Sequence, residues 1–254
     1  MRRTRLRRAA TALVGAILPA AASACSASFG MPPRGTAQSE DTFTLWRVFL
    51  AAGAVVAAIV YGLIIWSVAR YRRRRADGDD DVGRQFRANI PLELTYTAIP
   101  VIMIVVLFAL TFRVEQRVDD VAGAPDLVLH TEAFDWGWRF TYEGRGVSVV
   151  SPPTGEGAGG PTIVLPVDQT VRVVLTSNDV IHAFWVPGFL FKRDAIPGRV
   201  TTFDLTPTTT GTFDGKCAEF CGLNHAYMTF AIRVASGAEF ASWLADHRAS
   251  GAPT

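Results

Sequence analysis

The chain has 254 residues, of which 49% are hydrophobic, and a formal net charge of +2. That length suits one or two domains. Charge is unevenly distributed: residues 1–115 hold 15 Lys and Arg against 8 Asp and Glu, whereas residues 116–254 hold 10 against 15. This asymmetry predicts two different environments. Because the acidic half contains no run of Lys or Arg, a nucleic-acid-binding role is disfavoured.

Residues 1–24 have the layout of a secretory signal. A basic head is followed by an apolar stretch and a tail of small residues, which is typical of an export signal. Cys25 comes next, and "AASAC" resembles a bacterial lipoprotein cleavage site, with Ala22 where Leu is usual. Two interpretations stay open: Cys25 is a lipidated first residue, or the segment is an ordinary signal or first membrane helix.

Two apolar stretches predict a pair of transmembrane helices. Residues 48–69 and 94–112 carry no charged side chain, and each is long enough to cross a bilayer as a helix. The expected helices cover 45–70 and 91–114, joined by a cytoplasmic loop over 71–90.

The arginine-rich sequence "RYRRRR", residues 70–75, sets the expected orientation. A dense arginine cluster marks the cytoplasmic side of a span. The first helix therefore runs inwards and the second outwards, so everything after about residue 116 is extracytoplasmic. We expect a multi-pass protein of a bacterial cell membrane.

Residues 116–247 predict an all-β domain that ends in a short helix. Short runs rich in Val, Thr, Ile and Phe are separated by turn signals, and such runs predict a sandwich or barrel of antiparallel strands. The runs are "DLVLHTEAF", "TIVLPV", "VRVVLTS", "HAFWV", "VTTFDLT" and "FAIRV". In "SGAEFASWLADHRA", Ser236 and Glu239 form a capping box for a C-terminal helix.

The stretch "CAEFCGLNHAYM", residues 217–228, gathers two cysteines, a histidine and a methionine. Their spacings would align on one helix face, but Gly222 and Asn224 favour a turn. A disulfide between Cys217 and Cys221 suits an oxidising compartment. It would leave the histidine and the methionine unexplained.

A metal site explains all four side chains. Thiolate, imidazole and thioether together select copper over magnesium, calcium or manganese, and two cysteines could bridge two ions. A loop rarely completes such a site alone, and His182 in "SNDVIHAFWVPGF" is the best second histidine because it lies where two β runs meet. His130 and His247 have no metal-type neighbours in the sequence.

These residues and their spacing resemble the copper A loop of cytochrome c oxidase subunit II, a subunit of haem–copper terminal oxidases. The motif residues are His182, Cys217, Glu219, Cys221, His225 and Met228. Two membrane spans followed by an exported cupredoxin domain also match that subunit, so the resemblance covers nearly the whole mature chain. "LELTYTAIP", "WGWRFTY" and "KRDAIPGR" resemble further segments of the family.

The resemblance implies a dinuclear copper A centre that relays electrons. Cys217 and Cys221 would bridge the two ions. The remaining ligands form two pairs, His182 with Met228, and His225 with the backbone carbonyl of Glu219. Electrons would arrive from cytochrome c and pass to the haem of subunit I, which reduces dioxygen to water and pumps protons. The chain alone would catalyse nothing, and subunit III is a further expected partner.

The resemblance also implies roles around the copper ligands. The Glu219 carboxylate would hold magnesium or manganese at the contact with subunit I, unless it is simply solvated. Trp136 would be the exposed ring that receives the electron, although Gly137 stands where an aromatic residue is usual. Trp136 and Trp138 are two apart, so we expect them on one strand face, with Trp138 in the core.

Three acidic residues have weaker assignments. Asp135 and Asp179 lie next to the proposed receiving ring and the first ligand, so they are candidate docking charges for a basic donor; ordinary surface aspartates are the alternative. Glu93, at the cytoplasmic end of the second span, marks a proton path into subunit I in the family. It could equally lie among the lipid headgroups.

Other protein classes share parts of this pattern. A thioredoxin-type copper chaperone has C-x₃-C and a distant histidine, but does not need Glu219, His225 and Met228 at these spacings. Nitrous oxide reductases are longer chains with more histidines, and quinol oxidase subunits lack the copper ligands. The sequence contains no C-x-x-C-H, so a covalently bound c-type haem is not expected.

Overall fold

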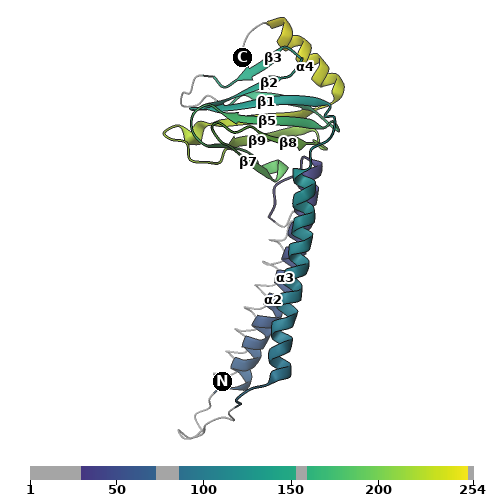
Figure 1. The fold of residues 1–254 in the computed structure, drawn as a ribbon, viewed down its shortest axis with the longest axis vertical. Helices are drawn as coiled ribbons and strands as arrows, with labels where there is room; N and C mark the ends of the chain where they lie inside the picture. Colours follow the sequence, from purple (N-terminus) through teal and green to yellow (C-terminus); the bar gives the residue numbers. More distant parts are fainter. Residues whose placement is uncertain (1–29, 73–85, 153–158, 251–254) are drawn as a thin grey trace, which may run out of the picture. The chain divides into compact units, whose positions relative to one another are not determined.

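The computed structural model describes residues 30–72, 86–152 and 159–250, with side chains through Arg248. The predicted signal and Cys25 lie outside these residues. The chain forms two compact units: Asp41–Asp120 is one, and Met1–Glu40 together with Val121–Thr254 is the other. Figure 1 shows the helical unit and the β-rich unit, and each is described by itself below.

Two long helices form the helical unit: α2 spans Ala37–Arg70 and α3 spans Ile90–Asp119. Both are long and apolar enough to cross a membrane, as the sequence predicted. α2 begins eight residues before the predicted start at residue 45, and α3 continues five residues past the predicted end at residue 114. An uncharged run marks only the part that suits hydrocarbon, whereas backbone hydrogen bonding continues a helix into polar residues.

The start of α3 is capped by its own side chains. The Asn89 side chain accepts from the Leu92 N–H at 3.3 Å, and the Glu93 carboxylate accepts from the Asn89 N–H at 3.0 Å. Both bonds satisfy N–H groups that a helix start leaves unpaired. Glu93 therefore has a structural role in this helix.

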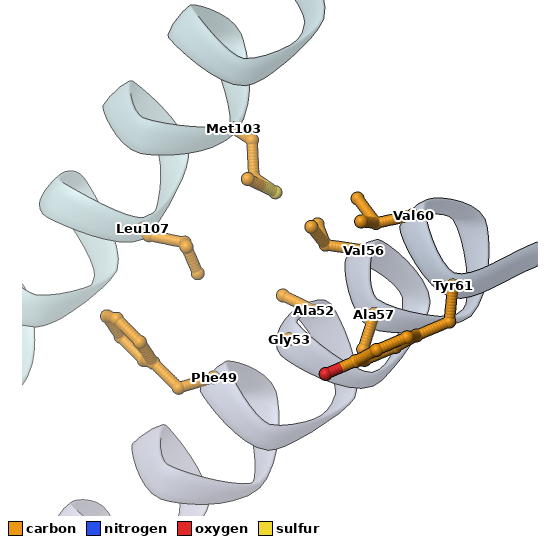
Figure 2. A pocket seen from close by; sticks show the side chains of 9 residues that line it. All are labelled: Phe49, Ala52, Gly53, Val56, Ala57, Val60, Tyr61, Met103 and Leu107. Atoms are coloured by element: carbon orange, nitrogen blue, oxygen red, sulfur yellow. The ribbon is translucent and has the colours of Figure 1, made fainter. Parts of the chain in front are cut away.

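An apolar cavity of about 480 Å³ lies between the two helices. Figure 2 shows Phe49 and Gly53 of α2 across from Met103 and Leu107 of α3. All its lining residues are uncharged, which fits a helix pair that packs in hydrocarbon through small and apolar side chains.

The β-domain is a sandwich of two five-stranded sheets, ordered β3-β2-β1-β5-β8 and β4-β10-β9-β6-β7 (Figure 1). The strands of the first sheet are β1 Leu127–Phe134, β2 Gly137–Tyr142, β3 Val147–Val150, β5 Val171–Ser177 and β8 Thr201–Leu205. Those of the second are β4 Thr162–Pro166, β6 His182–Val186, β7 Phe191–Ala195, β9 Gly211–Cys217 and β10 Thr229–Ala235. The predicted cupredoxin-like sandwich is confirmed, and each of the six predicted runs forms a strand.

The predicted antiparallel pairing holds for most neighbouring strands, but two pairs differ from it. β1 pairs with β5 in parallel, and β10 pairs with β4 in parallel. These partners are far apart in the sequence, so the spacing between runs carries no information on their relative direction. The sequence analysis also did not single out β2, β3, β7 and β9 as strands, and the last of these delivers the first cysteine of the cluster.

An aromatic core joins the two sheets beneath the cysteine loop. Trp138 of β2 is fully buried, and its ring centroid lies 5.3 Å from Phe230 and 6.2 Å from Phe184, both of the opposite sheet. Aromatic rings at such distances add to the stabilisation from burial alone. The core placement predicted for Trp138 is therefore confirmed.

Both segments that flank the helical hairpin are bound to the β-domain. Before α2, the Gly35 N–H donates to the Gly188 carbonyl at 2.8 Å, and the Gly35 carbonyl accepts from the Thr208 N–H at 2.9 Å. After α3, the Ala122 N–H donates to the Asp204 carboxylate at 2.7 Å. The sequence analysis did not foresee that residues before the first span belong to the β-domain.

The C-terminal helix α4, Gly237–Ser250, is close to its predicted position. The predicted capping box is present, because the Ser236 N–H donates to the Glu239 carboxylate at 2.9 Å and the Ser236 hydroxyl accepts from the Glu239 N–H at 3.3 Å. Phe240 and Trp243 of this helix pack against the ring of Tyr142.

Candidate metal centre

Local structure brings six potential ligands to one end of the sandwich. β9 ends at Cys217 and β10 begins at Thr229, and the Cys217 N–H donates to the Met228 carbonyl at 2.9 Å to close the loop between them. His182 begins β6, the neighbour of β9, whose register pairs Phe184 with Cys217. The helical-stripe alternative, which the sequence already disfavoured, does not apply: these residues occupy a strand end, a turn and a short 3₁₀ helix, His225–Tyr227.

Two free thiols form the centre of the group. The Sγ atoms of Cys217 and Cys221 lie 3.8 Å apart, well beyond the roughly 2.05 Å of a disulfide. Nδ1 of His182 lies 3.9 Å from the Cys217 sulfur, and Nδ1 of His225 lies 3.5 Å from the Cys221 sulfur. Each histidine thus presents the same ring nitrogen to a different cysteine.

Two weaker donors complete the set. The Met228 thioether sulfur lies 3.8 Å from the Cys221 sulfur, and the Glu219 carbonyl oxygen lies 3.2 Å from the Cys217 sulfur. His182, Cys217, Cys221 and Met228 are buried. Soft donors gathered this closely in an apolar surrounding fit copper better than the hard cations, and the gap between the thiols leaves room for bridging. The residues present therefore fit a two-copper group.

The two thiols have opposite electrostatic environments. Burial favours the neutral form of Cys217, but its contacts with His182 and with the backbone outweigh burial and lower its pKa. Burial raises the pKa of Cys221, and the negative charge of Cys217 raises it further. Since the thiolate is the metal-binding form of cysteine, the surroundings favour that form at Cys217 and disfavour it at Cys221.

His182 is held by a carboxylate on its other nitrogen. Its Nε2 donates to Oδ1 of Asp179 at 2.8 Å, and Oδ1 of Asp135 is 3.9 Å away. Burial opposes the charged ring, yet Cys217 and Asp179 together raise the pKa of His182. The sequence analysis placed Asp179 beside the ligand without recognising this bond, although a spacing of three residues was visible.

Trp136 lies in the turn between β1 and β2 and contacts the cysteine loop. Its indole N–H donates to the Cys221 carbonyl at 2.9 Å, and its ring is half-buried. The expectation that it shares a strand face with Trp138 was wrong, because β1 ends at Phe134 and β2 starts at Gly137. A tight turn interrupts the alternation that the spacing assumed.

Trp138 contacts the same group from the core. Its ring centroid is 6.4 Å from that of His182, and its indole N–H points to the Met228 carbonyl at 3.5 Å. The sequence analysis assigned this residue to packing alone. No spacing rule links β2 to the loop, so only the fold reveals the contact.

The remaining candidates lie apart from the thiols. The Glu219 carboxylate is ion-paired with the Lys192 ammonium, and Glu93 belongs to the helical unit. His130 pairs with Glu143, and His247 bonds the carbonyl of Trp243, so the structure keeps both outside the group, as expected.

Comparison with known proteins agrees with this geometry. Residues 159–235 match the family model described as cytochrome C oxidase subunit II, periplasmic domain. A probable cytochrome c oxidase subunit 2 of Streptomyces avermitilis is 35% identical, over 96% of this chain and 88% of the relative. The chain belongs to the cytochrome c oxidase subunit 2 family.

Further relatives extend the comparison. The cytochrome c oxidase subunit 2 of Mycobacterium bovis is 33% identical, over 94% of this chain and 81% of the relative. Among solved structures, the periplasmic domain of subunit II of cytochrome oxidase from Bradyrhizobium japonicum is 36% identical over 52% of this chain and 100% of that one, with a TM-score of 0.48. Family membership makes the chain one subunit of an oxidase and implies a subunit I partner.

Proposed function

We propose that the chain accepts electrons from cytochrome c at a dinuclear copper A centre and relays them to the haem of subunit I, where dioxygen is reduced to water and protons are pumped. The observation that carries this proposal is the convergence of two free thiols, each facing the Nδ1 atom of one histidine. A blue-copper site uses a single cysteine thiolate, and a methionine thioether is not among the usual ligands of zinc.

The ligands divide into a shared pair and two end pairs. Cys217 and Cys221 would be shared by both copper ions. The end pairs would be His182 with Met228, and His225 with the carbonyl oxygen of Glu219. Two copper ions held in this way would share one transferred electron, so that the geometric change on reduction would be spread over many bonds.

The surrounding protein favours relay over catalysis. Six donors would be available to the two ions, which would leave no position that a substrate needs to occupy. Cys217 is fixed by strand pairing and Met228 by its backbone bond to Cys217. A site held this rigidly needs little rearrangement when the charge changes.

Trp136 is the proposed ring through which the electron arrives. It is half-buried in a turn, and its N–H bonds the backbone of the bridging Cys221. Asp135 and Asp179 lie on adjoining turns, with side chains 34% and 31% exposed. Their charges would attract a basic donor.

Two further carboxylates serve the partner subunit in this proposal. The Glu219 side chain would hold magnesium or manganese at the contact with subunit I, which suits a hard oxygen ligand and requires its pairing with Lys192 to open. Glu93 would mark a proton path into subunit I, in addition to capping α3.

The β-domain is proposed to lie outside a bacterial membrane, with subunits I and III as partners in the bilayer. The arginines at 70–75 favour a cytoplasmic turn. Both flanks of the hairpin bind the same domain, which supports placing both outer ends on one side. Residues 1–24 would be the signal and Cys25 a lipidation site.

Cys217→Ser in the assembled oxidase tests this function. We expect oxidation of reduced cytochrome c to be lost together with copper from this subunit, while the haem spectra of subunit I persist. His130→Asn is the control, because it changes a histidine of the same domain that pairs with Glu143, outside the site. Normal turnover without copper in this subunit would contradict the proposal.

A further inference from the structure

Asp179 lies in the loop between β5 and β6, three residues before the candidate ligand His182. Both of its carboxylate oxygens are engaged. Oδ1 accepts from His182 Nε2 at 2.8 Å and from the Val180 N–H at 2.7 Å, and Oδ2 accepts from the Asp135 N–H at 2.6 Å. The loop is itself braced, because the Ser177 hydroxyl donates to the Val180 carbonyl.

The bond to His182 determines which ring nitrogen can bind metal. The carboxylate accepts only, so Nε2 carries the proton and Nδ1 keeps its lone pair. Nδ1 is the atom that faces the Cys217 sulfur. Carboxylates commonly orient metal-binding histidines in this way, and His182 is fully buried, so no water competes for Nε2.

The bond to Asp135 ties the same carboxylate to the turn that carries Trp136. That turn has a second attachment, from the Trp136 indole N–H to the Cys221 carbonyl at 2.9 Å. The ring also lies against the loop backbone, because a Cβ atom placed on Gly222 would come within 3.1 Å of it. Three segments from distant parts of the sequence are thus joined through one carboxylate and one indole.

We propose that Asp179 is a positioning residue that holds the His182 ring and the Asp135–Trp136 turn in one fixed arrangement, so that the receiving ring keeps a constant distance to the metal ligands. The effect on electron transfer rests on the proposed copper function, whereas the hydrogen bonds of Asp179 do not depend on it. Asp179 then acts chiefly as an internal brace. A pure docking charge would not need three hydrogen bonds inside its own domain.

The first test uses the metal-free full-length chain and hydrogen exchange of the peptide around Asp135. Asp179→Ala removes the acceptor, and we expect the Asp135 amide to exchange about tenfold faster. Asp179→Asn is a second variant in case the first fails to fold: its amide oxygen can still accept from His182, but its NH₂ group cannot accept from Asp135. Asp246→Asn, on the exposed face of α4, is the control and should exchange like the unaltered chain.

Asp135→Asn separates charge from positioning. It removes the other carboxylate near His182 but keeps the backbone N–H that Asp179 binds. We expect the backbone amide at residue 135 to exchange within about twofold of its rate in the unaltered chain, since its hydrogen bond to Asp179 persists. If Asp135→Asn accelerates exchange as much as Asp179→Ala, or if neither Asp179 variant accelerates it, the positioning role is overturned.

The second test uses the assembled oxidase with reduced cytochrome c. A positioning role predicts that Asp179→Asn lowers kcat by about threefold or more. Loss of a docking charge alone would raise KM, weaken the salt dependence and leave kcat unchanged, and that result would overturn the inference. Failure of the unaltered subunit to bind copper would refute the proposed function. Hydrogen exchange of the Asp135 amide in the metal-free chain would still decide whether Asp179 is a positioning residue.

Discussion

The indole N–H of Trp136 and the carbonyl oxygen of Cys221 are joined by a hydrogen bond of 2.9 Å, although 85 residues separate them. The bond connects the candidate receiving ring directly to the backbone of a candidate bridging ligand. An electron arriving at the ring therefore has one hydrogen bond and one residue to cross before it reaches a thiolate.

Trp136→Phe keeps an aromatic ring but removes this bond. One hydrogen bond is worth about 1 kcal/mol, which corresponds to about fivefold in a rate, so we expect copper to be retained while electron uptake from cytochrome c slows by up to about that factor. Rapid mixing with reduced cytochrome c measures the rate. Trp185→Phe, at another half-buried tryptophan of the same domain, should leave it unchanged, and an equal effect of both variants would contradict the assignment.

Gly222→Ala should disturb the loop from within. Gly222 has φ of +116°, and an added Cβ would lie 3.1 Å from the Trp136 ring. Strained backbone of this kind costs about 1–3 kcal/mol, so we expect a lower unfolding midpoint and weaker copper binding. Gly237→Ala adds a methyl group where nothing lies within 4 Å and is the matched control. Equal midpoints for the two variants would count against the loop geometry.

Asp204→Ala should destabilise the β-domain strongly. Asp204 is buried, and it accepts from Arg172 at 2.9 Å and from the Ala122 N–H at 2.7 Å. Its loss leaves the Ala122 N–H and the Arg172 guanidinium without this acceptor. Because the Arg172 side chain is 21% exposed, water partly replaces the carboxylate, and we expect a cost of about 1–3 kcal/mol. Glu40→Ala breaks the exposed pair with Arg34 and should cost at most about 1 kcal/mol. Tryptophan fluorescence during unfolding distinguishes the two.

Protonation of His182 offers a test in the metal-free chain. Cys217 and Asp179 raise the pKa of His182 despite burial. The stabilisation that the protonated ring gives the folded state is therefore complete below the pKa of histidine in the unfolded chain, about 6.5. It is lost as pH rises through the higher folded pKa. Asp179→Ala should bring that pKa down.

The imidazole should be titrated directly by nuclear magnetic resonance, because Cys217 contributes with the opposite sign. The pKa of that thiol is lowered, so its contribution is present at high pH and is lost as pH falls. A His182 titration that is identical in the unaltered chain and in Asp179→Ala would show that the carboxylate does not act on the ring.

The sequence predicted the features that local composition determines. Hydropathy located both long helices, β-branched runs located six strands, and ligand chemistry selected the residues from Cys217 to Met228 that the structure brings together. The Ser236–Glu239 cap was visible because its partners are three residues apart.

Long-range contacts could not be predicted in the same way. The parallel pairing of β1 with β5, the attachment of Gly35 to the β-domain, and the contact of Trp138 with the loop all join distant segments, and no periodicity encodes them. The position of Trp136 was missed because a two-residue turn leaves the same spacing as a continuous strand.

Electron paramagnetic resonance of the copper-loaded full-length chain, together with a copper count, tests the central claim most directly. The full chain is required because the Gly35 segment belongs to the β-domain. We predict two coppers per chain that share one unpaired electron, with both the stoichiometry and the signal lost in Cys217→Ser and kept in His130→Asn, which lies outside the site. One copper with a single-ion signal, or no copper and an oxidised Cys217–Cys221 pair, would contradict the account.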